Sequence, residues 1–469
     1  MDSEPMGLTS QLADYAMATT VDDIPREARD KAAQCVLDAV GCMIAGSRSR
    51  LGHMMAEYAR SVGAVGPCTL FGLPMTSAVE TACLVNGTFA HVLEMDDGHR
   101  PSDNHLGAAV VPAALAVAQH QNSSGREFLR AVVLGYDVMG RIGQAVLFPR
   151  DDTPFHHTAT TAGFGAAVAA GLLTGLNRAQ FVNALGIAGN GGAGLREPQV
   201  TGADCKPFQV ARGAQSGVSA AILAACGVQG PSAILEGRFG FLRAFTPTPR
   251  PEQVTKDLGT RFATVESAFK VHAACGRVFT AVDAAIEVRN SHGLNPADID
   301  HVEVGLPQWI TSDRVFSRSR PVDAGAARFS IPFCVAAALH DGEVTSTQVS
   351  EAGVRSAALA DLESKIDIVV DDEVDEIFEQ TKNDDFFFYP AAVTVVSGGQ
   401  TLRRVVTSPR GYDPRRPLTE AEVVDKFIGS AAPVCGEASA RAIAARVLAV
   451  EDVDRMDSDV FAFGPDQAP

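Results

Sequence analysis

The sequence has little of what nucleic-acid-binding and membrane-binding proteins need. Basic residues are outnumbered, with 39 Lys and Arg against 56 Asp and Glu, so the formal net charge of the 469 residues is −17. Binding to nucleic acid or to an anionic membrane requires a basic surface. We therefore expect neither nucleic acid nor a membrane as a partner.

The marks of secretion and of membrane insertion are also missing. Residues 1–5 contain no basic segment followed by an apolar one, so we expect no secretory signal. The apolar stretch 106–118 is shorter than the ~20 residues that cross a bilayer. The nine Cys form no CxxC pair, and most of them stand among Ala, Val and Leu, as buried thiols do. These features predict a cytoplasmic protein without disulfides or a zinc site.

Common catalytic and nucleotide-binding motifs are absent. The sequence contains no Walker motif, strand-anchored GxGxxG, HExxH or GxSxG. The Gly-rich stretch 189–194 follows a helical pattern, so we interpret it as a tight joint between helices. The acidic run 371–379 is interpreted as a solvated surface.

What the sequence does contain is an Ala-rich helical pattern. Hydrophobic residues make up 46% of the chain, mostly Ala, Val and Leu, while Trp309 is the one Trp. Because Ala is the best helix former, a mainly helical protein is favoured. Apolar residues at helical spacing predict helices over 24–40, 77–93, 106–119, 126–147, 160–174, 178–188 and 213–225.

Near residue 270 the pattern changes. Val302, Val304 and Leu306 alternate with charged or small residues, as in a half-buried strand, and the segments 365–370, 391–396 and 401–407 also have the composition of strands. Helices are expected between them over 278–289, 331–339 and 348–358, and again at the end over 419–428 and 438–448. We predict a mainly α protein with a large all-helical domain built from both ends of the chain, residues 1–268 and 409–469. A smaller α+β lid domain would span 269–408.

Polar clusters interrupt the apolar helical sequence, and each has more than one interpretation. The first holds Glu94, Asp96, Asp97, His99 and His105, in a loop between two predicted helices. Helix capping explains these residues without any chemistry. Metal binding is the alternative for such Asp and His residues, although the spacing matches no standard site.

The other clusters contain histidine or lysine. His156 precedes an Ala/Gly-rich helix, whose N-terminus favours a neutral imidazole, although a loop contact would also explain it. Lys206 stands before Pro207 and an apolar helix that carries Arg212. It can present a cation to a carboxylate, and the alternative is an ordinary surface Lys. A last group opens the α+β segment and could face the same cleft: Lys270, His272, Cys275 and Arg277.

Longer stretches give these clusters a context. The stretches are residues 86–99 with His105, then 135–142, 155–156, 184–189, 206–208, 235–240, 269–270, 328–330 and 417–419. In these stretches the sequence resembles the MmgE/PrpD family. The matching stretches follow the family's order and cover nearly the whole chain. That family includes 2-methylcitrate dehydratases, cis-aconitate decarboxylases and an iminodisuccinate epimerase.

The resemblance implies a fold and a kind of site. It implies a large helical domain, a smaller α+β lid, a homodimer, and an active site in the cleft between the domains. That site would bind a small polycarboxylate and would need neither a cofactor nor a metal. The family's active-site acid, its two His and its two Lys correspond to Glu94, His105, His156, Lys206 and Lys270.

Five positions depart from the family's pattern. Decarboxylase-like members carry Asp where Glu94 stands, Thr near Gly98, and His where Cys275 stands. Many members have His in place of Gln209, and an aromatic residue is common where His272 stands. These departures argue against a plain decarboxylase that forms itaconate.

The family's reactions share one step, the handling of a proton or a carboxylate at a carbon next to a carboxylate. Such a carbon needs a base, and cations must neutralise the charge that develops. We predict that His105 or His156 is the base, that the other or Tyr136 returns the proton, and that Asp97 or Glu94 orients an imidazole.

Substrate binding is predicted to depend on cations. Lys206 and Lys270 would hold carboxylates with help from Arg212 or Arg277, and His99, His272 and Cys275 would complete the substrate site. The expected activity is that of a hydro-lyase acting on a 2-methylcitrate-like acid. An epimerase, a decarboxylase and a catalytically silent binding protein are the alternatives.

Overall fold

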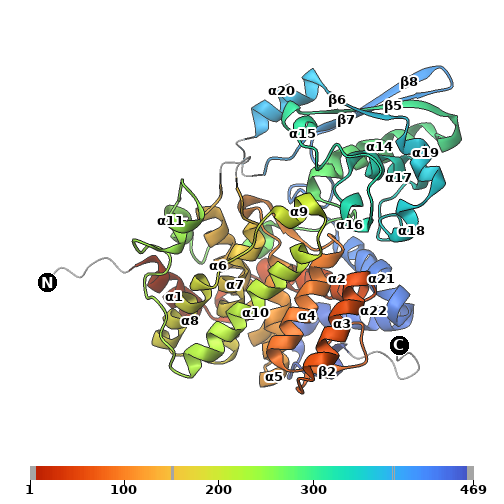
Figure 1. The fold of residues 1–469 in the computed structure, drawn as a ribbon. Coiled ribbons are helices and arrows are strands. Elements are labelled where there is room, and N and C mark those ends of the chain that lie inside the picture. The colour runs from red at the N-terminus through yellow and green to blue at the C-terminus, as the bar shows by residue number, and fades with distance from the viewer. Residues whose placement is uncertain (1–6, 149–152, 383, 385, 462–469) are drawn as a thin grey trace.

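A computed structural model describes residues 7–148, 153–382, 384 and 386–461, which form a helical body with a smaller α+β part beside it (Figure 1). The longer helices of the body are α1 (Leu8–Ala18), α2 (Arg26–Gly46), α3 (Arg50–Val62), α4 (Val79–Val92), α5 (Leu106–Gln121), α6 (Gly125–Ala145), α7 (His157–Leu173), α8 (Arg178–Asn190), α10 (Cys205–Ala225), α21 (Glu420–Cys435) and α22 (Glu437–Leu448). Short helices and strands connect them: β1 (Cys68–Thr69), β2 (Thr76–Ser77), β3 (Gly98–His99), α9 (Glu197–Thr201), α11 (Phe241–Phe245), α12 (Glu252–Thr255), α13 (Ala263–Glu266) and β4 (Ser267–Ala268).

Small residues let the central helices approach closely. A Cβ atom added to Gly217 on α10 would lie 2.2 Å from the carbonyl oxygen of Gly163 on α7, so no side chain fits at this crossing. The neighbouring Ala166 is fully buried. The Ala- and Gly-rich composition therefore produces a tightly packed helical core.

Both ends of the chain build this core. Phe427 on α21 and Ile443 on α22 are buried in the same apolar cluster as Val36 and Val40 of α2. Figure 1 shows α21 and α22, in blue, beside the red and orange helices of the N-terminal half. The predicted fold class is confirmed, while the boundaries after residues 268 and 408 stay a prediction.

The α+β part contains a four-stranded sheet in the order β6-β5-β7-β8. Strand β5 (Ile299–Leu306) runs parallel to β6 (Ile366–Val370) and antiparallel to β7 (Ala391–Ser397), which pairs antiparallel with β8 (Gln400–Val406). The helices of this part are α14 (Phe279–His292), α15 (Gln308–Ser312), α16 (Ala324–Ala327), α17 (Ile331–Asp341), α18 (Glu351–Val354), α19 (Ala357–Glu363) and α20 (Asp372–Thr381). Val92, Leu93 and Met95 of the body extend into its apolar core, so the two parts share a packed joint.

Three local expectations differ from the structure or are refined by it. The expected helix 348–358 is wrong, because Ser350 and Ser356 each cap a separate short helix, α18 and α19. Helix α10 begins eight residues earlier than expected and so carries Lys206 in its first turn. The acidic run 371–379 is largely the exposed face of α20, whose Val374 and Phe378 are buried.

Two findings bear on compartment and redox state. None of the described helices is both long and apolar enough to cross a membrane. All nine Cys are free, and Cys205 and Cys226 are the exposed ones.

Candidate active site

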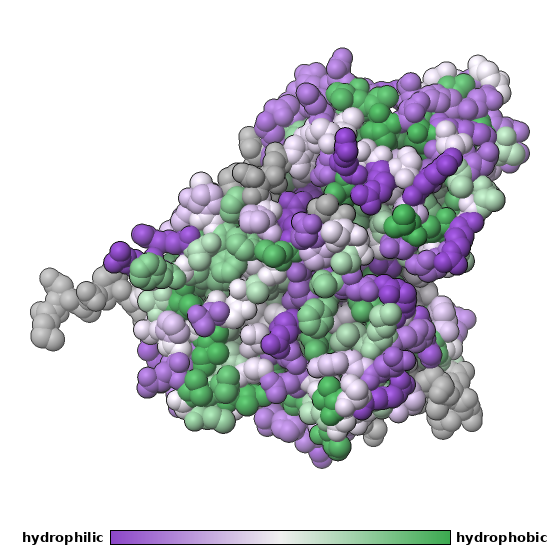
Figure 2. All heavy atoms as spheres, viewed as in Figure 1, coloured by the Kyte–Doolittle hydropathy of each residue, from purple (hydrophilic) through white to green (hydrophobic). Residues whose placement is uncertain are grey.

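A cavity lies where the helical body meets the α+β part, and it has about 650 Å³ of empty space, some of it open to solvent. Figure 2 shows hydrophilic side chains gathered along this junction. The body and the segment before α14 both contribute to the lining, which includes Glu94, His105, His156, Lys206, Lys270, Cys275, Arg277, Tyr389 and Tyr412. Four clusters that lie far apart in the sequence therefore meet in one place.

Glu94 lies at the centre of this group. It follows the end of α4 with a backbone φ of 55°, in the left-handed region that non-Gly residues seldom adopt. Its Oε1 hydrogen-bonds to Lys206 Nζ, and its Oε2 lies 3.1 Å from Lys270 Nζ. All three side chains are buried. Burial alone would raise the pKa of Glu94, but the two lysine charges hold it well below its usual range.

His91, which the sequence did not single out as a site residue, holds Lys206 in place. Lys206 Nζ lies 2.8 Å from His91 Nε2, and His91 Nδ1 lies 2.7 Å from Asp96 Oδ2. Because an ammonium group only donates, Nε2 accepts and Nδ1 donates its proton to Asp96. A chain of hydrogen bonds thus runs from Asp96 through His91 and Lys206 to Glu94. The sequence does contain a signal that could have identified His91 as a site residue. It stands one helical turn before Glu94, in a stretch that resembles the family.

His105 has a defined tautomer. Its Nδ1 lies 2.7 Å from the backbone carbonyl oxygen of Asp97 and 3.6 Å from Asp96 Oδ2. A carbonyl only accepts, so Nδ1 carries the proton and Nε2 keeps its lone pair. No residue in the described part of the chain hydrogen-bonds to that Nε2. Burial and the charge of Lys270 lower the pKa of His105 to about 3, so the ring is neutral at neutral pH.

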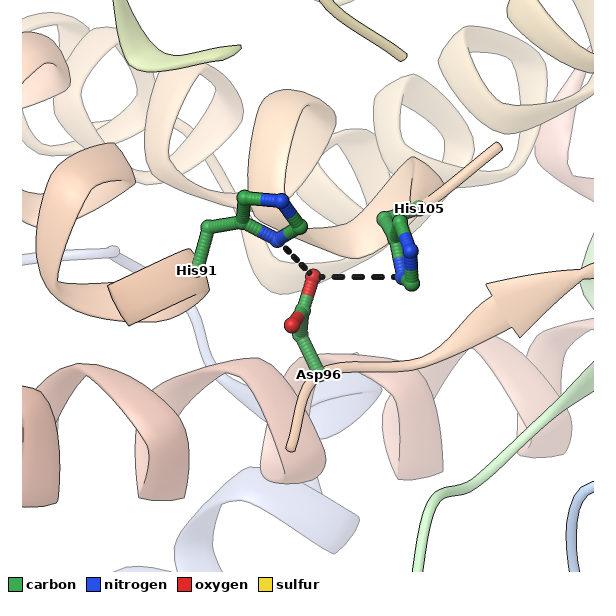
Figure 3. A group of neighbouring side chains, drawn as sticks. All are labelled: His91, Asp96 and His105. Atoms are coloured by element: carbon green, nitrogen blue, oxygen red, sulfur yellow. Dashed lines mark hydrogen bonds and ion pairs between the residues drawn. The ribbon is translucent and has the colours of Figure 1, made fainter. Parts of the chain in front are cut away.

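One cluster has the side chains of a metal site: His91, Asp96 and His105. One ligand atom from each lies within 4.8 Å of the others, and Figure 3 shows both rings turned toward the Asp96 carboxylate. Both imidazole nitrogens that face Asp96 already carry protons bonded to oxygen acceptors. A cation would have to displace both protons. Hydrogen bonding therefore explains the arrangement of the three side chains without a metal ion. The absence of a metal from the reaction stays a prediction.

His156 occupies the N-cap position of α7, without a capping hydrogen bond from its side chain, and lines the same cavity. Its Nδ1 lies 2.9 Å from Nε2 of Gln209, and its ring centroid is 5.8 Å from that of His91. Burial and the charge of Lys206 hold the pKa of His156 well below its usual value. Like His105, it is a neutral imidazole in a site rich in cations.

Asp97 and Tyr136 are not among the residues that line this cavity. Tyr136 is fully buried on α6 beneath Gly107, whose added Cβ would lie 2.6 Å from the Tyr136 hydroxyl. Its role in returning a proton stays a prediction. Asp97 orients His105 through its backbone carbonyl, while its carboxyl Oδ1 accepts from the Gly107 N–H at 2.9 Å. Burial raises the pKa of that carboxyl to about 7.

Three predicted substrate-binding residues lie elsewhere. His99 is held between Ser102 Oγ and Glu266 Oε2 at 2.7 and 3.1 Å, and His272 Nε2 lies 2.8 Å from Asp283. Arg212 is exposed on α10, where it contacts Gln215. None of the three is among the residues that line this cavity, and their part in substrate binding stays a prediction. Cys275 and Arg277 do line the cavity.

Arg100 is a further residue that the sequence did not indicate. Its Nε donates to the carbonyl oxygen of Phe387 at 2.9 Å, and its guanidinium lies 3.9 Å from the centroid of the Phe387 ring. Arg100 belongs to the body and Phe387 to the α+β part, so this contact holds the two walls of the cavity together. Only the fold brings the two residues near each other.

Comparison with known proteins agrees with the resemblance across the chain. Models of the MmgE/PrpD N-terminal and C-terminal domains match residues 10–254 and 272–452. A cis-aconitate decarboxylase-like protein of Aspergillus oryzae, oryM, is 27% identical over 96% of this chain and 96% of its own length. The cis-aconitate decarboxylase of Aspergillus terreus is 26% identical over 95% and 93%, and the human enzyme is 26% identical over 89% and 86%.

Proposed function

Since the chain belongs to the MmgE/PrpD family, we propose that it is a lyase that acts on a small di- or tricarboxylate without a cofactor. The observation that carries this proposal is the position of His105. His105, whose Nε2 carries no proton, lines a cavity that the buried Lys206 and Lys270 also line. A base next to fixed cations is what proton abstraction beside a carboxylate requires.

The proposed reaction begins with a substrate carboxylate near Lys206 and Lys270. His105 Nε2 takes the proton from the carbon next to that carboxylate, while the cations stabilise the negative charge that develops on its oxygens. The electron pair of the C–H bond then forms the C=C bond as the C–O bond to the hydroxyl group breaks. The proton on His105 passes to the departing hydroxide, and water leaves.

Binding of the substrate would strengthen this base. Burial and, after it, the charge of Lys270 lower the pKa of His105 in the free protein. A bound polyanion offsets that positive charge and so raises the pKa of the imidazole toward the working pH. The base therefore becomes effective when the substrate is present.

Dehydration is the first candidate because it needs a base, which the loss of CO₂ does not. The Glu at position 94 and the Cys at position 275 also differ from decarboxylase-like members. Decarboxylation is the second candidate, because the relatives described above are named cis-aconitate decarboxylases or as similar to them. In that reaction a C–C bond breaks, and a proton must be delivered to the carbon that remains.

A panel of di- and tricarboxylates incubated with the protein in D₂O tests the proposal. Loss of water identified by mass spectrometry supports dehydration, and loss of CO₂ supports the second candidate. Deuterium gained without loss of mass would indicate epimerisation instead. Binding without turnover across the panel would indicate a silent binding protein. The homodimer stays a prediction, and light scattering in solution tests it.

A further inference from the structure

The side-chain amide of Gln209 is held in one orientation by the backbone of Leu195. Its Oε1 accepts from the Leu195 N–H at 3.2 Å, and its Nε2 donates to the Leu195 carbonyl oxygen at 3.1 Å. Reversing the amide would set oxygen against oxygen and N–H against N–H. The NH₂ group therefore faces His156, whose Nδ1 lies 2.9 Å away.

The backbone around Leu195 is fixed to the segment that carries His156. Leu195 pairs with Phe155 in a β-bridge, and the His156 N–H donates to the Gly194 carbonyl oxygen at 3.1 Å. The Arg196 N–H donates to the Pro154 carbonyl oxygen at 3.0 Å. The imidazole and the residue that anchors its partner thus belong to one hydrogen-bonded unit, which limits movement between them.

The contact assigns the proton of His156. An NH₂ group only donates, so Nδ1 must accept, and the proton of the neutral ring lies on Nε2. His105 has the opposite arrangement, with its proton on Nδ1 and its lone pair on Nε2. The two rings that line the cavity therefore differ at Nε2, where His105 has the lone pair of a base and His156 has an N–H donor.

We propose that Gln209 is a positioning residue that keeps His156 as a neutral Nε2–H donor to a substrate oxygen. A neutral imidazole at a helix N-terminus can polarise a substrate oxygen without giving up its proton. In the proposed reaction His156 would donate to a carboxylate oxygen while charge develops on it. This role rests on the proposed function, whereas the position of the proton does not.

Solid-state NMR of the full-length protein with ring-¹⁵N-labelled His tests the tautomer. The His156 signals are identified as those lost in His156→Asn. We expect Nδ1 in the unprotonated range and Nε2 in the protonated range. The reverse pattern, or two protonated nitrogens, at neutral pH would overturn the proposal. This result needs no substrate, so a failure of the proposed function cannot be mistaken for a failure of the tautomer assignment.

Gln209→Glu tests the consequence for catalysis. A carboxylate at position 209 accepts a hydrogen bond from Nδ1–H, so at high pH the neutral ring carries its one proton on Nδ1 and none on Nε2. At low pH the imidazolium carries a proton on both nitrogens, and the Nε2–H donor returns. We expect kcat to fall by about tenfold or more at high pH and to recover as the pH is lowered. A variant that keeps the wild-type pH dependence would contradict the proposal.

Two further variants separate positioning from folding. Gln209→Met keeps the volume but removes the donor, and we expect kcat to fall about tenfold with little change in KM. Gln215→Glu places the same charge on the same helix, outside the described lining of the cavity, and should leave the pH profile unchanged. An equal change of the profile in Gln215→Glu would show that the charge acts at long range, and the proposal would fail.

Discussion

Glu94 Oε2 and Lys270 Nζ lie 3.1 Å apart in the protein interior, although the two residues are 176 positions apart in the chain. Glu94 follows the last turn of α4, and Lys270 lies in the segment that leads to the α+β part. Removing one partner of a buried ion pair leaves the other charge uncompensated. The stability of the fold and the electrostatics of the cavity therefore depend on the same contact.

A double-mutant cycle measures this dependence. Lys270→Met should lower the free energy of unfolding by about 3–5 kcal/mol, because Glu94 is left with one cation in a buried position. Adding Glu94→Gln removes the uncompensated charge, so the double variant should be more stable than the sum of the single effects predicts. Urea denaturation at pH 7 gives the coupling, which we expect to be about 1–3 kcal/mol. Purely additive effects would contradict the importance of the pair.

The pH dependence of Lys270→Met reports on His105. Burial and, after it, the Lys270 charge lower the pKa of His105 to about 3, so the wild-type base stays unprotonated down to a pH near 3. Without that charge the pKa rises, and the acid limb of kcat/KM should move to higher pH. Stopped assays from pH 4 to 8, on samples whose folding is checked by circular dichroism, make the comparison. An unmoved acid limb would exclude His105 as the group that sets it.

Substitution of His105 tests most directly whether this residue is the base. His105→Asn should lower kcat by roughly 10²–10⁴-fold, the usual contribution of general acid–base catalysis. His120→Asn is the matched control, because His120 is exposed at the end of α5. Near-wild-type turnover by the His105 variant would remove that residue from the role of base.

The raised pKa of Asp97 should make the stability of the protein depend on pH. Burial raises the pKa of this carboxyl in the folded protein to about 7 from an ordinary value of 3.8, so between these values the folded protein keeps a proton that the unfolded chain has released. The contribution of Asp97 to stability therefore falls as the pH rises from about 4 to about 7.

Asp97→Asn should remove that fall, because the amide stays neutral and its oxygen still accepts from Gly107. The variant should gain stability relative to the wild type by up to about 1.4 kcal/mol per pH unit, and by at most about 4 kcal/mol in all. Urea denaturation at pH 5 and pH 8 measures the difference, with the exposed Asp300→Asn as the control. A difference that does not change with pH would contradict the buried, protonated carboxyl.

The sequence predicted the elements well where one pattern persisted. A continuous run of Ala, Val and Leu located α5, whose residues Leu106–Gln119 are all buried, and alternation located β5, where Val302 and Val304 are buried and Glu303 is exposed. The expected helix over 348–358 failed at Ser356, which offers a new N-terminal cap in the middle of the segment.

The site was only partly predictable for a different reason. His105, His156, Lys206 and Lys270 do line one cavity. His91 was missed because it looks like the last turn of an apolar helix, and its partner Lys206 is 115 positions away.

His99 and His272 show the opposite situation. Each was assigned to the substrate site because it stands near other polar residues in the sequence. Each in fact pairs with a carboxylate from another segment, Glu266 for His99 and Asp283 for His272. A sequence shows which side chains can form hydrogen bonds, whereas the fold decides which partners they find.

The packing of α21 and α22 against α2 has a consequence for how the protein is made. Residues from both ends of the chain share one apolar core, so the helical body cannot be completed until the ribosome has added the last 50 or so residues. The α+β core is finished earlier, because nearly all of its residues lie between 273 and 406. During synthesis the part of α2 that packs on α21 and α22 therefore stays uncovered until these helices are made, while α4 and α6 cover other parts of it earlier. A chaperone that shields apolar helices would find its target in that interval.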